Sequence, residues 1–466
     1  MKNVFLLGCF FIIMGWGCKD HKNPNKPPRI DPSVPEIRIF RGQKNDVYLY
    51  DNVKDEDVYS AFWTAENFDQ DIISIQITRG SSFRIASLAD EVISTKATFV
   101  LHDKQGLQDS QEVIIFIDHE IETNEKYYDP IDLDKDLLSF APLQTLYDPA
   151  KNILHSVYTK KILGDGPQVQ AKNIGLYYIA LNSNNEIVKN DLIKNYDGGD
   201  LHISLALHPQ SGNFFLASTH ALSELSGEAW ITEDVKEIFG NFSFGFNPAT
   251  HVPEAACNTS SGDRNLYFSE KGVNGWETYL ASYEDAVFES MAYNPLTNSR
   301  SIIYRTLNWN NHPGYILGFS VSIDIVADDT DFDVNTSCLL KYDSKGIPHI
   351  IYGKFINTSL NHAWVSDGMV HKEEIDNNCD VRGAVPGFII APDDSIYVCY
   401  TKLSSEHWAN ILMLAHSKGD GWEKGTIAQN ILKIDFGPWT SVAIDNMGKM
   451  SFLFTADERL YFIKQK

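Results

Sequence analysis

Residues 304–315, YRTLNWNNHPGY, place an arginine, a tryptophan and a histidine directly after the alternating run SRSII. The three side chains suit complementary chemistry. Arginine neutralises a carboxylate, a tryptophan face stacks on a sugar ring, and histidine exchanges protons near neutral pH. The segment therefore indicates either part of a binding or catalytic site or a turn with aromatic packing.

A cation follows a tyrosine at the predicted end of a strand in four places, namely Tyr158-Thr-Lys160, Tyr304-Arg305, Tyr352-Gly-Lys354 and Tyr400-Thr-Lys402. Segments predicted as loops add His202, His220, Trp309, His312, His362, Arg382, His407 and Trp439. Each type has a structural explanation, since strand-end tyrosines fill cores and lysines occupy solvated edges. The functional alternative is a basic, aromatic surface for an anionic ligand.

A repeated turn organises the chain from about residue 125 onward. Each unit has an apolar strand, a turn and a second apolar strand, with the turns at Tyr147-Asp-Pro, Leu207-His-Pro, Phe246-Asn-Pro, Tyr293-Asn-Pro, Tyr342-Asp-Ser, Ala391-Pro-Asp and Ile444-Asp-Asn. A spacing of roughly 40 to 60 residues matches a propeller blade. We predict a seven-bladed β-propeller over residues 125–466, whose incomplete last blade is closed by a strand at about 128–134.

In a propeller, loops between second and third strands open on the same face as the loops between blades. We therefore expect the cations, histidines and tryptophans above to share one face. Residues 304–315 are then predicted to form the loop between the second and third strands of the fourth blade. In that loop, Trp309 suits sugar stacking and His312 suits proton transfer.

Composition restricts the class of protein. The chain of 466 residues is 43% hydrophobic and 12% aromatic, which suits a globular core, and its formal net charge of −23 argues against a nucleic-acid partner. Residues 1–17 are predicted to be a signal peptide, and residues 18–35 a Pro-rich tether. The segment before Cys18 resembles a bacterial lipoprotein signal, with Cys9 as the alternative. Lys19-Asp20 resembles the export tag of Bacteroidetes surface lipoproteins. The resemblance implies lipidation of Cys18 and an outer-membrane location facing the medium.

Residues 36–120 alternate in short β-rich runs and are predicted to form a β-sandwich. The runs LYDNVKDED and FVLHDKQGLQDSQEVIIFI resemble cadherin-like or other immunoglobulin-like modules. The overall prediction is thus an all-β chain with an Ig/cadherin-like β-sandwich, acting as a spacer, followed by the propeller. Asp55, Asp57 and Asp103 leave open a calcium site or a solvated edge.

The repeat, with its G-x-W turns in SEKGVNGWE and SKGDGWE, resembles BNR-repeat, sialidase-like propellers, and within them the ulvan-lyase-type polysaccharide lyases. No unit carries a complete Asp-box, and Asp200-Leu201 stands where those lyases have a His-Asn pair. The resemblance implies β-elimination on an acidic, uronate-containing and possibly sulfated polysaccharide. That reaction needs a cation on the carboxylate, a base and an acid.

Two functions remain open for this face. In a lyase, His312, His407, Tyr304 and Arg382 would be catalytic, with Arg305, Trp309, His202, His220, Lys354, Lys402 and Trp439 binding the polysaccharide. In a non-catalytic surface glycan-binding protein, the same residues would bind without proton transfer, alongside components of an outer-membrane glycan importer. A propeller for adhesion or protein interaction is a third reading.

Metal and disulfide chemistry have weaker signals. The runs Asp132-x-Asp134-x-Asp136 and Asp329-x-Asp331-x-Asp333 resemble the start of calcium loops but lack the glycine and distal glutamate, so a solvated charge run is the alternative. No cofactor is otherwise predicted. Cys338 and Cys399 lie in apolar runs and read as core thiols, whereas Cys379 leaves one disulfide open.

Overall fold

A computed structural model describes residues 27–30, 33–34, 36–40, 44–49, 52–54, 62–79, 82–89, 93–118, 121–135, 137, 143–161, 174–196, 202–236, 240, 242–258, 265–282, 286–306, 313–317, 321–324, 338–354, 358–379, 386–403, 409–418, 421–432, 439–456 and 459–466. The regular elements of these residues are β-strands, with no α-helix among them. No helix in this part of the chain is long and apolar enough to cross a membrane. The all-β prediction is confirmed.

The chain divides into two compact units, one of residues 1–37, 46–85 and 94–116 and one of residues 38–45, 86–93 and 117–466. The N-terminal strands form three sheets, in the orders β1-β4, β2-β9-β8-β5 and β3-β7-β6. Their bounds are β1 Arg29–Ile30, β2 Ile37–Phe40, β3 Lys44–Tyr48, β4 Val53–Lys54, β5 Phe62–Glu66, β6 Ile73–Arg79, β7 Ser82–Ser87, β8 Ile93–His102 and β9 Gln108–Asp118.

Asp103 has a structural role in the turn between β8 and β9. Its carboxylate is buried and accepts hydrogen bonds from the backbone N–H groups of Gln105 and Leu107, at 2.8 Å each. Gly106 supplies the left-handed backbone (φ 83°) that this turn needs. The carboxylate is therefore occupied in holding the turn, while Asp55 and Asp57 lie outside the described residues.

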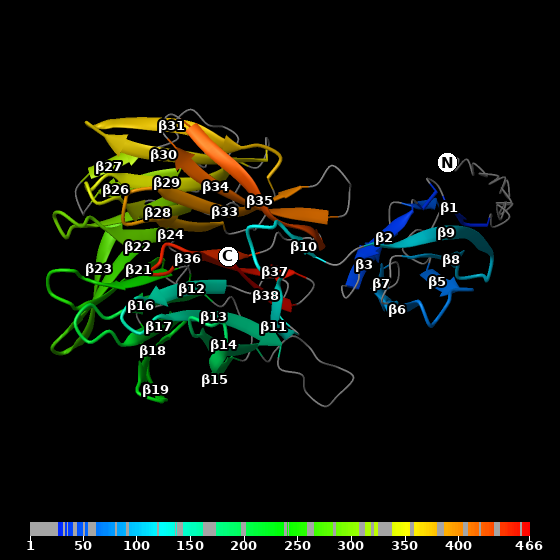
Figure 1. The fold of residues 1–466 in the computed structure, drawn as a ribbon, viewed down its shortest axis with the longest axis horizontal. Helices are drawn as coiled ribbons and strands as arrows, with labels where there is room; N and C mark the ends of the chain where they lie inside the picture. The colour runs from blue at the N-terminus through cyan, green and yellow to red at the C-terminus, as the bar shows by residue number, and fades with distance from the viewer. Residues whose placement is uncertain are drawn as a thin grey trace, which may run out of the picture. The chain divides into compact units, whose positions relative to one another are not determined.

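Seven antiparallel sheets, six of four strands and one of five, make up the larger unit (Figure 1). Their strands are β11 Ile131–Lys135, β38 Arg459–Lys464, β37 Met450–Ala456 and β36 Thr440–Ile444; β12 Leu143–Asp148, β13 Ile153–Lys161, β14 Ile174–Leu181 and β15 Ile187–Tyr196; β16 Ile203–Leu207, β17 Phe214–Ser218, β18 Ala221–Ser226 and β19 Ala229–Asp234; β20 Phe242–Phe246, β21 Pro253–Asn258, β22 Leu266–Gly272 and β23 Gly275–Ser282; β24 Ala286–Tyr293, β25 Arg300–Thr306, β26 Pro313–Leu317 and β27 Val321–Asp324; β28 Cys338–Tyr342, β29 Pro348–Lys354, β30 Ser359–Ser366 and β31 Met369–Asp376; and β10 Glu122–Thr123, β35 Gly421–Leu432, β34 Ala409–Lys418, β33 Ile396–Leu403 and β32 Gly387–Ile390.

The first strands of these sheets contact one another in a closed cycle, β12 to β16, β20, β24, β28, β32, β36 and back to β12. Each sheet continues outward from its first strand in sequence order, except that β10 and β11 are added at the outer edges of two sheets. This radial arrangement is that of a β-propeller.

Side chains bond neighbouring first strands together at equivalent positions. Gln144 Nε2 donates to the Ile203 carbonyl (2.8 Å), and Ser204 Oγ accepts from the Phe244 N–H (3.0 Å). The Gly387 N–H donates to Thr440 Oγ1 at 3.0 Å. Each bond joins residues near the start of both strands, so the neighbouring first strands run in the same direction. At the other ends of the strands, the turns are joined by bonds of Asn294 to Gly346, Ser344 to Asp394 and Asn446 to Pro149. Together these bonds place the starts of all seven first strands on one face of the propeller.

The seven repeated turns lie between the first and second strands, as predicted. Asp148, Asn247, Asn294, Asp343 and Asp445 each accept backbone N–H bonds with a side-chain oxygen, and His208 does so with Nδ1. A left-handed residue completes each turn, at Asn152, Gly212, His251, Asn298, Gly346, Asp394 and Gly448. The Asx and Gly signals of the sequence therefore encode turn geometry. We call this side of the propeller the turn face.

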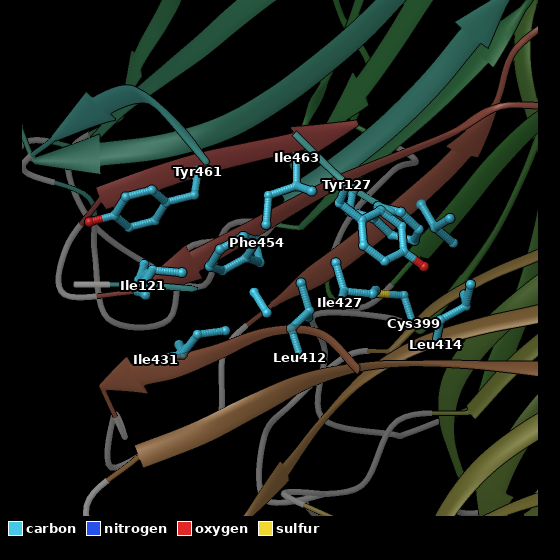
Figure 2. Packing of buried hydrophobic residues seen from close by; sticks show 14 of the residues in the cluster. Ile121, Tyr127, Cys399, Leu412, Leu414, Ile427, Ile431, Phe454, Tyr461 and Ile463 are labelled. Atoms are coloured by element: carbon cyan, nitrogen blue, oxygen red, sulfur yellow. The ribbon is translucent and has the colours of Figure 1, made fainter. Parts of the chain in front are cut away.

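Strand β11 closes the ring by pairing with the C-terminal strand β38, with Ile131 opposite Phe462. The prediction that residues near 128–134 complete the last sheet is confirmed. Beside this closure, a buried cluster packs Ile121 and Tyr127 against residues of β34, β35, β37 and β38 (Figure 2). The Tyr127 ring meets Phe452 edge to face, with ring centroids 5.7 Å apart.

The four described cysteines are free and buried, namely Cys257, Cys338, Cys379 and Cys399. Cys338 and Cys399 are core thiols, as predicted. Cys379 forms no disulfide, and burial raises the pKa of its thiol to about 12, so the thiolate needed for disulfide exchange is scarce.

Candidate functional site

The face opposite the turn face carries the residues predicted to bind ligand, and we call it the loop face. It lies where first strands begin and second strands end, as in the pairings of Leu143 with Tyr158 and of Gly387 with Cys399. The described candidates on it are His202, His220, Tyr304, Arg305, Lys354, Lys402 and Trp439.

His202 and His220 lie at the same corner of one sheet. His202 immediately precedes β16 and its N–H donates to Thr219 Oγ1 at 3.3 Å, while His220 follows β17. Ile203 pairs with Ser218, which fixes the two histidines at one end of these strands. His220 is exposed in a left-handed conformation (φ 61°), and His202 is half-buried with its ring 6.4 Å from Phe242. Two histidines thus lie at this corner.

Trp439 and Lys354 are half-buried on the same face. Trp439 precedes β36, exchanges hydrogen bonds with Thr455 through its backbone, and packs against the cluster that contains Leu143 and Tyr158. Lys354 ends β29 opposite Ser359. Trp439 therefore supports the contact between the last and first sheets while the residue remains partly exposed.

Tyr304 belongs to the core. Its side chain is 1% exposed and packs with Ala256, Phe268 and Ile302. A tyrosine exchanging protons with a polysaccharide needs an accessible hydroxyl, so this placement favours the core-filling alternative. Arg305 follows on β25, opposite Val287.

Lys402 is part of a repeated contact that the sequence pattern did not reveal. Its Nζ lies 3.0 Å from both carboxylate oxygens of Asp376, which also accept a bond from the Tyr400 hydroxyl (2.7 Å) and one from Lys424 (3.1 Å). The same contact occurs where the ring closes: Tyr158 and Lys160 bond Asp134 at 2.6 and 2.7 Å. We call this arrangement the tyrosine-lysine-aspartate clasp.

In each clasp, an aspartate of one outermost strand holds the second strand of the next sheet. Burial alone would raise the pKa of the Asp376 carboxyl, but the bonds from Tyr400, Lys402 and Lys424 outweigh it and lower the pKa below its usual value. Burial and the Asp376 carboxylate raise the pKa of Tyr400 well above its ordinary value. Two of the four tyrosine-cation motifs therefore join sheets, which gives Lys402 a structural role beside its predicted ligand contact.

Two aspartates of the acidic run near residue 132 bond different partners in the structure. Asp132 pairs with Arg459 at 2.7 Å, and Asp134 belongs to the clasp. Asp136 and the run from Asp329 to Asp333 lie outside the described residues. No group of three or more histidines, cysteines or acids is placed to hold a metal ion in the described part of the chain.

Five predicted residues also lie outside the described residues, namely His312, His407, Arg382, Trp309 and Cys18. His362 is described, and its predicted loop position is wrong because it lies in β30, buried between sheets. There it bonds His349 (3.0 Å) and Glu373 (2.9 Å). Burial lowers the pKa of His362 to about 4, so the imidazole is neutral at physiological pH.

A cavity of about 390 Å³ runs along the axis between the first strands. Its lining extends from Leu143 and Gly387 at the loop face to Tyr147 and Ile444 at the turn face. It also contains Lys341, which the sequence analysis missed. A signal for it exists in the sequence, because Lys341 is charged at a position of the repeat where the other six units have uncharged residues. These residues are Leu146, Ala206, Gly245, Ala292, Ile389 and Ala443.

Comparisons with known proteins found structures that are distantly similar but no relative by sequence. No family model and no curated protein sequence matches the chain. Similar solved structures include AofleA from Arthrobotrys oligospora (13% identity, TM-score 0.42, 64% of this chain and 89% of that one). Others are the six-bladed β-propeller fucose lectin of Aleuria aurantia (11%, 0.41, 63% and 97%) and the SapL1 lectin bound to α-methyl fucoside (10%, 0.40, 63% and 97%). At these identities and TM-scores, nothing about ligand or activity is carried over.

Proposed function

We propose that the protein binds an acidic polysaccharide on the loop face. The observation that carries this proposal is the common direction of the first strands, which gathers His202, His220, Arg305, Lys354 and Trp439 at one end of their sheets. Half-buried or exposed aromatic rings stack on sugars, and cations and imidazoles suit carboxylate or sulfate groups. Because the chain is strongly acidic overall, such a surface would select anions locally.

The proposal includes the finer architecture. Each of the seven sheets is one blade of a seven-bladed propeller of the BNR-repeat type, and the N-terminal sheets form an Ig-like spacer. We further propose that lipidation of Cys18 anchors the protein to the outer membrane facing the medium, where it acts in polysaccharide utilisation beside importer components.

Cleavage by β-elimination is the second candidate function. The pair at the corner of β16 and β17 favours it, because two neighbouring imidazoles could serve as base and acid once a cation neutralises the uronate carboxylate. His312, His407 and Arg382 remain proposed catalytic residues. Tyr304 is the weakest member of that set because its side chain is buried.

The test uses purified protein with ulvan, alginate, pectin and glycosaminoglycans, measuring affinity by calorimetry and unsaturated product by ultraviolet absorbance. We expect binding to at least one polymer, weakened about tenfold by His202→Asn or His220→Asn, since losing a charge-assisted bond reduces affinity by this order. The matched control is His251→Asn, which changes another left-handed histidine in a turn-face turn. Binding without new absorbance on any polymer would reject the lyase. Binding to none of them would reject the proposal.

A further inference from the structure

The described lining of the axial cavity is polar at specific points and carries one charge. Of the described residues that line it, Lys341 is the only charged one, and no aspartate or glutamate lines the wall. The volume of about 390 Å³ lies at the lower end of the range for small-molecule sites. The wall therefore favours a small ligand of negative charge.

Lys341 has no carboxylate partner among the residues that the structure describes. The Nζ of Lys341 lies over the Phe388 ring, with the ring centroid at 5.9 Å. The Lys341 side chain is exposed to the cavity, yet the strands that line the cavity exclude much of the bulk solvent, and this desolvation lowers the pKa of Lys341. An uncompensated ammonium in such a place gains from a bound anion.

Hydroxyls on the wall of the same cavity add hydrogen-bond capacity. Thr145 Oγ1 and Ser441 Oγ bond to each other across β12 and β36, and both residues line the cavity. Two hydroxyls carry two hydrogens, and their mutual bond uses one of them. The other can be donated to a ligand oxygen. The Gln144 amide, by contrast, already bonds the next strand: its Nε2 donates to the Ile203 carbonyl and its Oε1 accepts from the Leu205 N–H.

We propose that the axial cavity is an anion site centred on Lys341, which takes a small oxyanion bearing a carboxylate or sulfate group. The ammonium supplies the charge, and the Thr145-Ser441 pair supplies a hydrogen-bond donor. This site is separate from polymer binding on the loop face and does not depend on it.

Calorimetry on the full chain tests the site, with glucuronate and sulfate as probes, glucose as the neutral control, and sodium chloride holding the ionic strength constant. The two anions distinguish the carboxylate from the sulfate class. We expect binding of at least one anion, a loss of about tenfold or more in Lys341→Met, and retention in Lys341→Arg. Lys345→Met is the matched control, because Lys345 is 71% exposed in the adjoining turn.

The folded state of Lys341→Met is checked by its thermal unfolding midpoint, which should not fall, since no ion pair with a described residue is removed. The proposal is overturned if the wild-type protein binds neither anion, if Lys341→Met binds as the wild type does, or if glucose binds as tightly as glucuronate. Lys341→Met should bind an acidic polymer as the wild type does, so a loss of small-anion binding alone separates this site from the loop face.

Discussion

Replacing Asp376 by asparagine removes the charge from the second clasp while keeping the size of the side chain. The Asp376 side chain is 4% exposed and accepts bonds from Tyr400, Lys402 and Lys424. Tyr400 is buried, so its charge-assisted bond should contribute about 1.5–3 kcal/mol. Lys402 and Lys424 are 28% and 39% exposed, and solvent reduces each of their contributions to about 1 kcal/mol or less. Together these terms predict a loss of about 1.5–5 kcal/mol in the free energy of unfolding.

The assay is equilibrium urea unfolding at pH 7, followed by tryptophan fluorescence. Asp234→Asn is the control, because that carboxylate is 86% exposed and lies 3.6 Å from Lys194, so less than about 0.5 kcal/mol should be lost. The pKa of Asp376 is lowered in the folded protein, so its contribution is present above the unfolded pKa of about 3.9 and is lost as pH falls through the folded value. The difference between wild type and Asp376→Asn should thus shrink below about pH 4. A loss under 1 kcal/mol at pH 7, or a difference that grows in acid, would refute this account of the clasp.

Three further outcomes follow from buried groups. Burial lowers the pKa values of His155 and His362 to about 4, so the unfolded chain takes up protons before the folded chain does. As the pH falls from about 6.5 to 4, the folded protein should therefore lose roughly 3 kcal/mol of stability per histidine. His362→Gln should reduce this pH dependence in urea unfolding, and an unchanged pH dependence would contradict the explanation. Gly387→Ala should destabilise the protein by about 1–3 kcal/mol in the same assay, because a Cβ there would lie 2.8 Å from the Val442 nitrogen. In the control Gly368→Ala the new Cβ meets no atom within 4 Å, so the loss should be only the cost of about 1 kcal/mol for a left-handed alanine. Equal effects would contradict the close approach of β32 and β36. Leu133→Ala in the closing strand should lose about 2–4 kcal/mol, and a neutral result would contradict its packing role.

The repeat could be predicted from the sequence because its turns obey local rules. Asp148, Asn247 and Asp445 accept bonds from residues two to four positions onward, so their geometry depends on adjacent residues alone. The closing strand was predictable for a similar reason, since an incomplete last unit needs a partner for β38.

The clasps and the axial lysine were not predictable in this way. Tyr400 and Lys402 lie on β33, but their aspartate lies on β31 of the preceding sheet. Likewise, Lys160 lies on β13, whereas Asp134 lies on β11, which belongs to the sheet that closes the ring. In the sequence, a cation after a tyrosine is equally compatible with a ligand contact and with a contact between sheets. The position of the partner aspartate is needed to distinguish the two. His362 was assigned to a loop, but Glu373 and His349 provide hydrogen-bond partners for it inside the sheet.

The most direct test of the central claim compares binding of one polysaccharide in two chemical states. Calorimetry would titrate the protein with an acidic polymer identified in the panel above and with the same polymer after reduction of its carboxyl groups or removal of its sulfate groups. The account predicts that the native polymer binds and that the neutralised polymer binds at least about tenfold more weakly, with the difference reduced at high salt. Equal affinity for both states would contradict selection of an anionic ligand by the loop face.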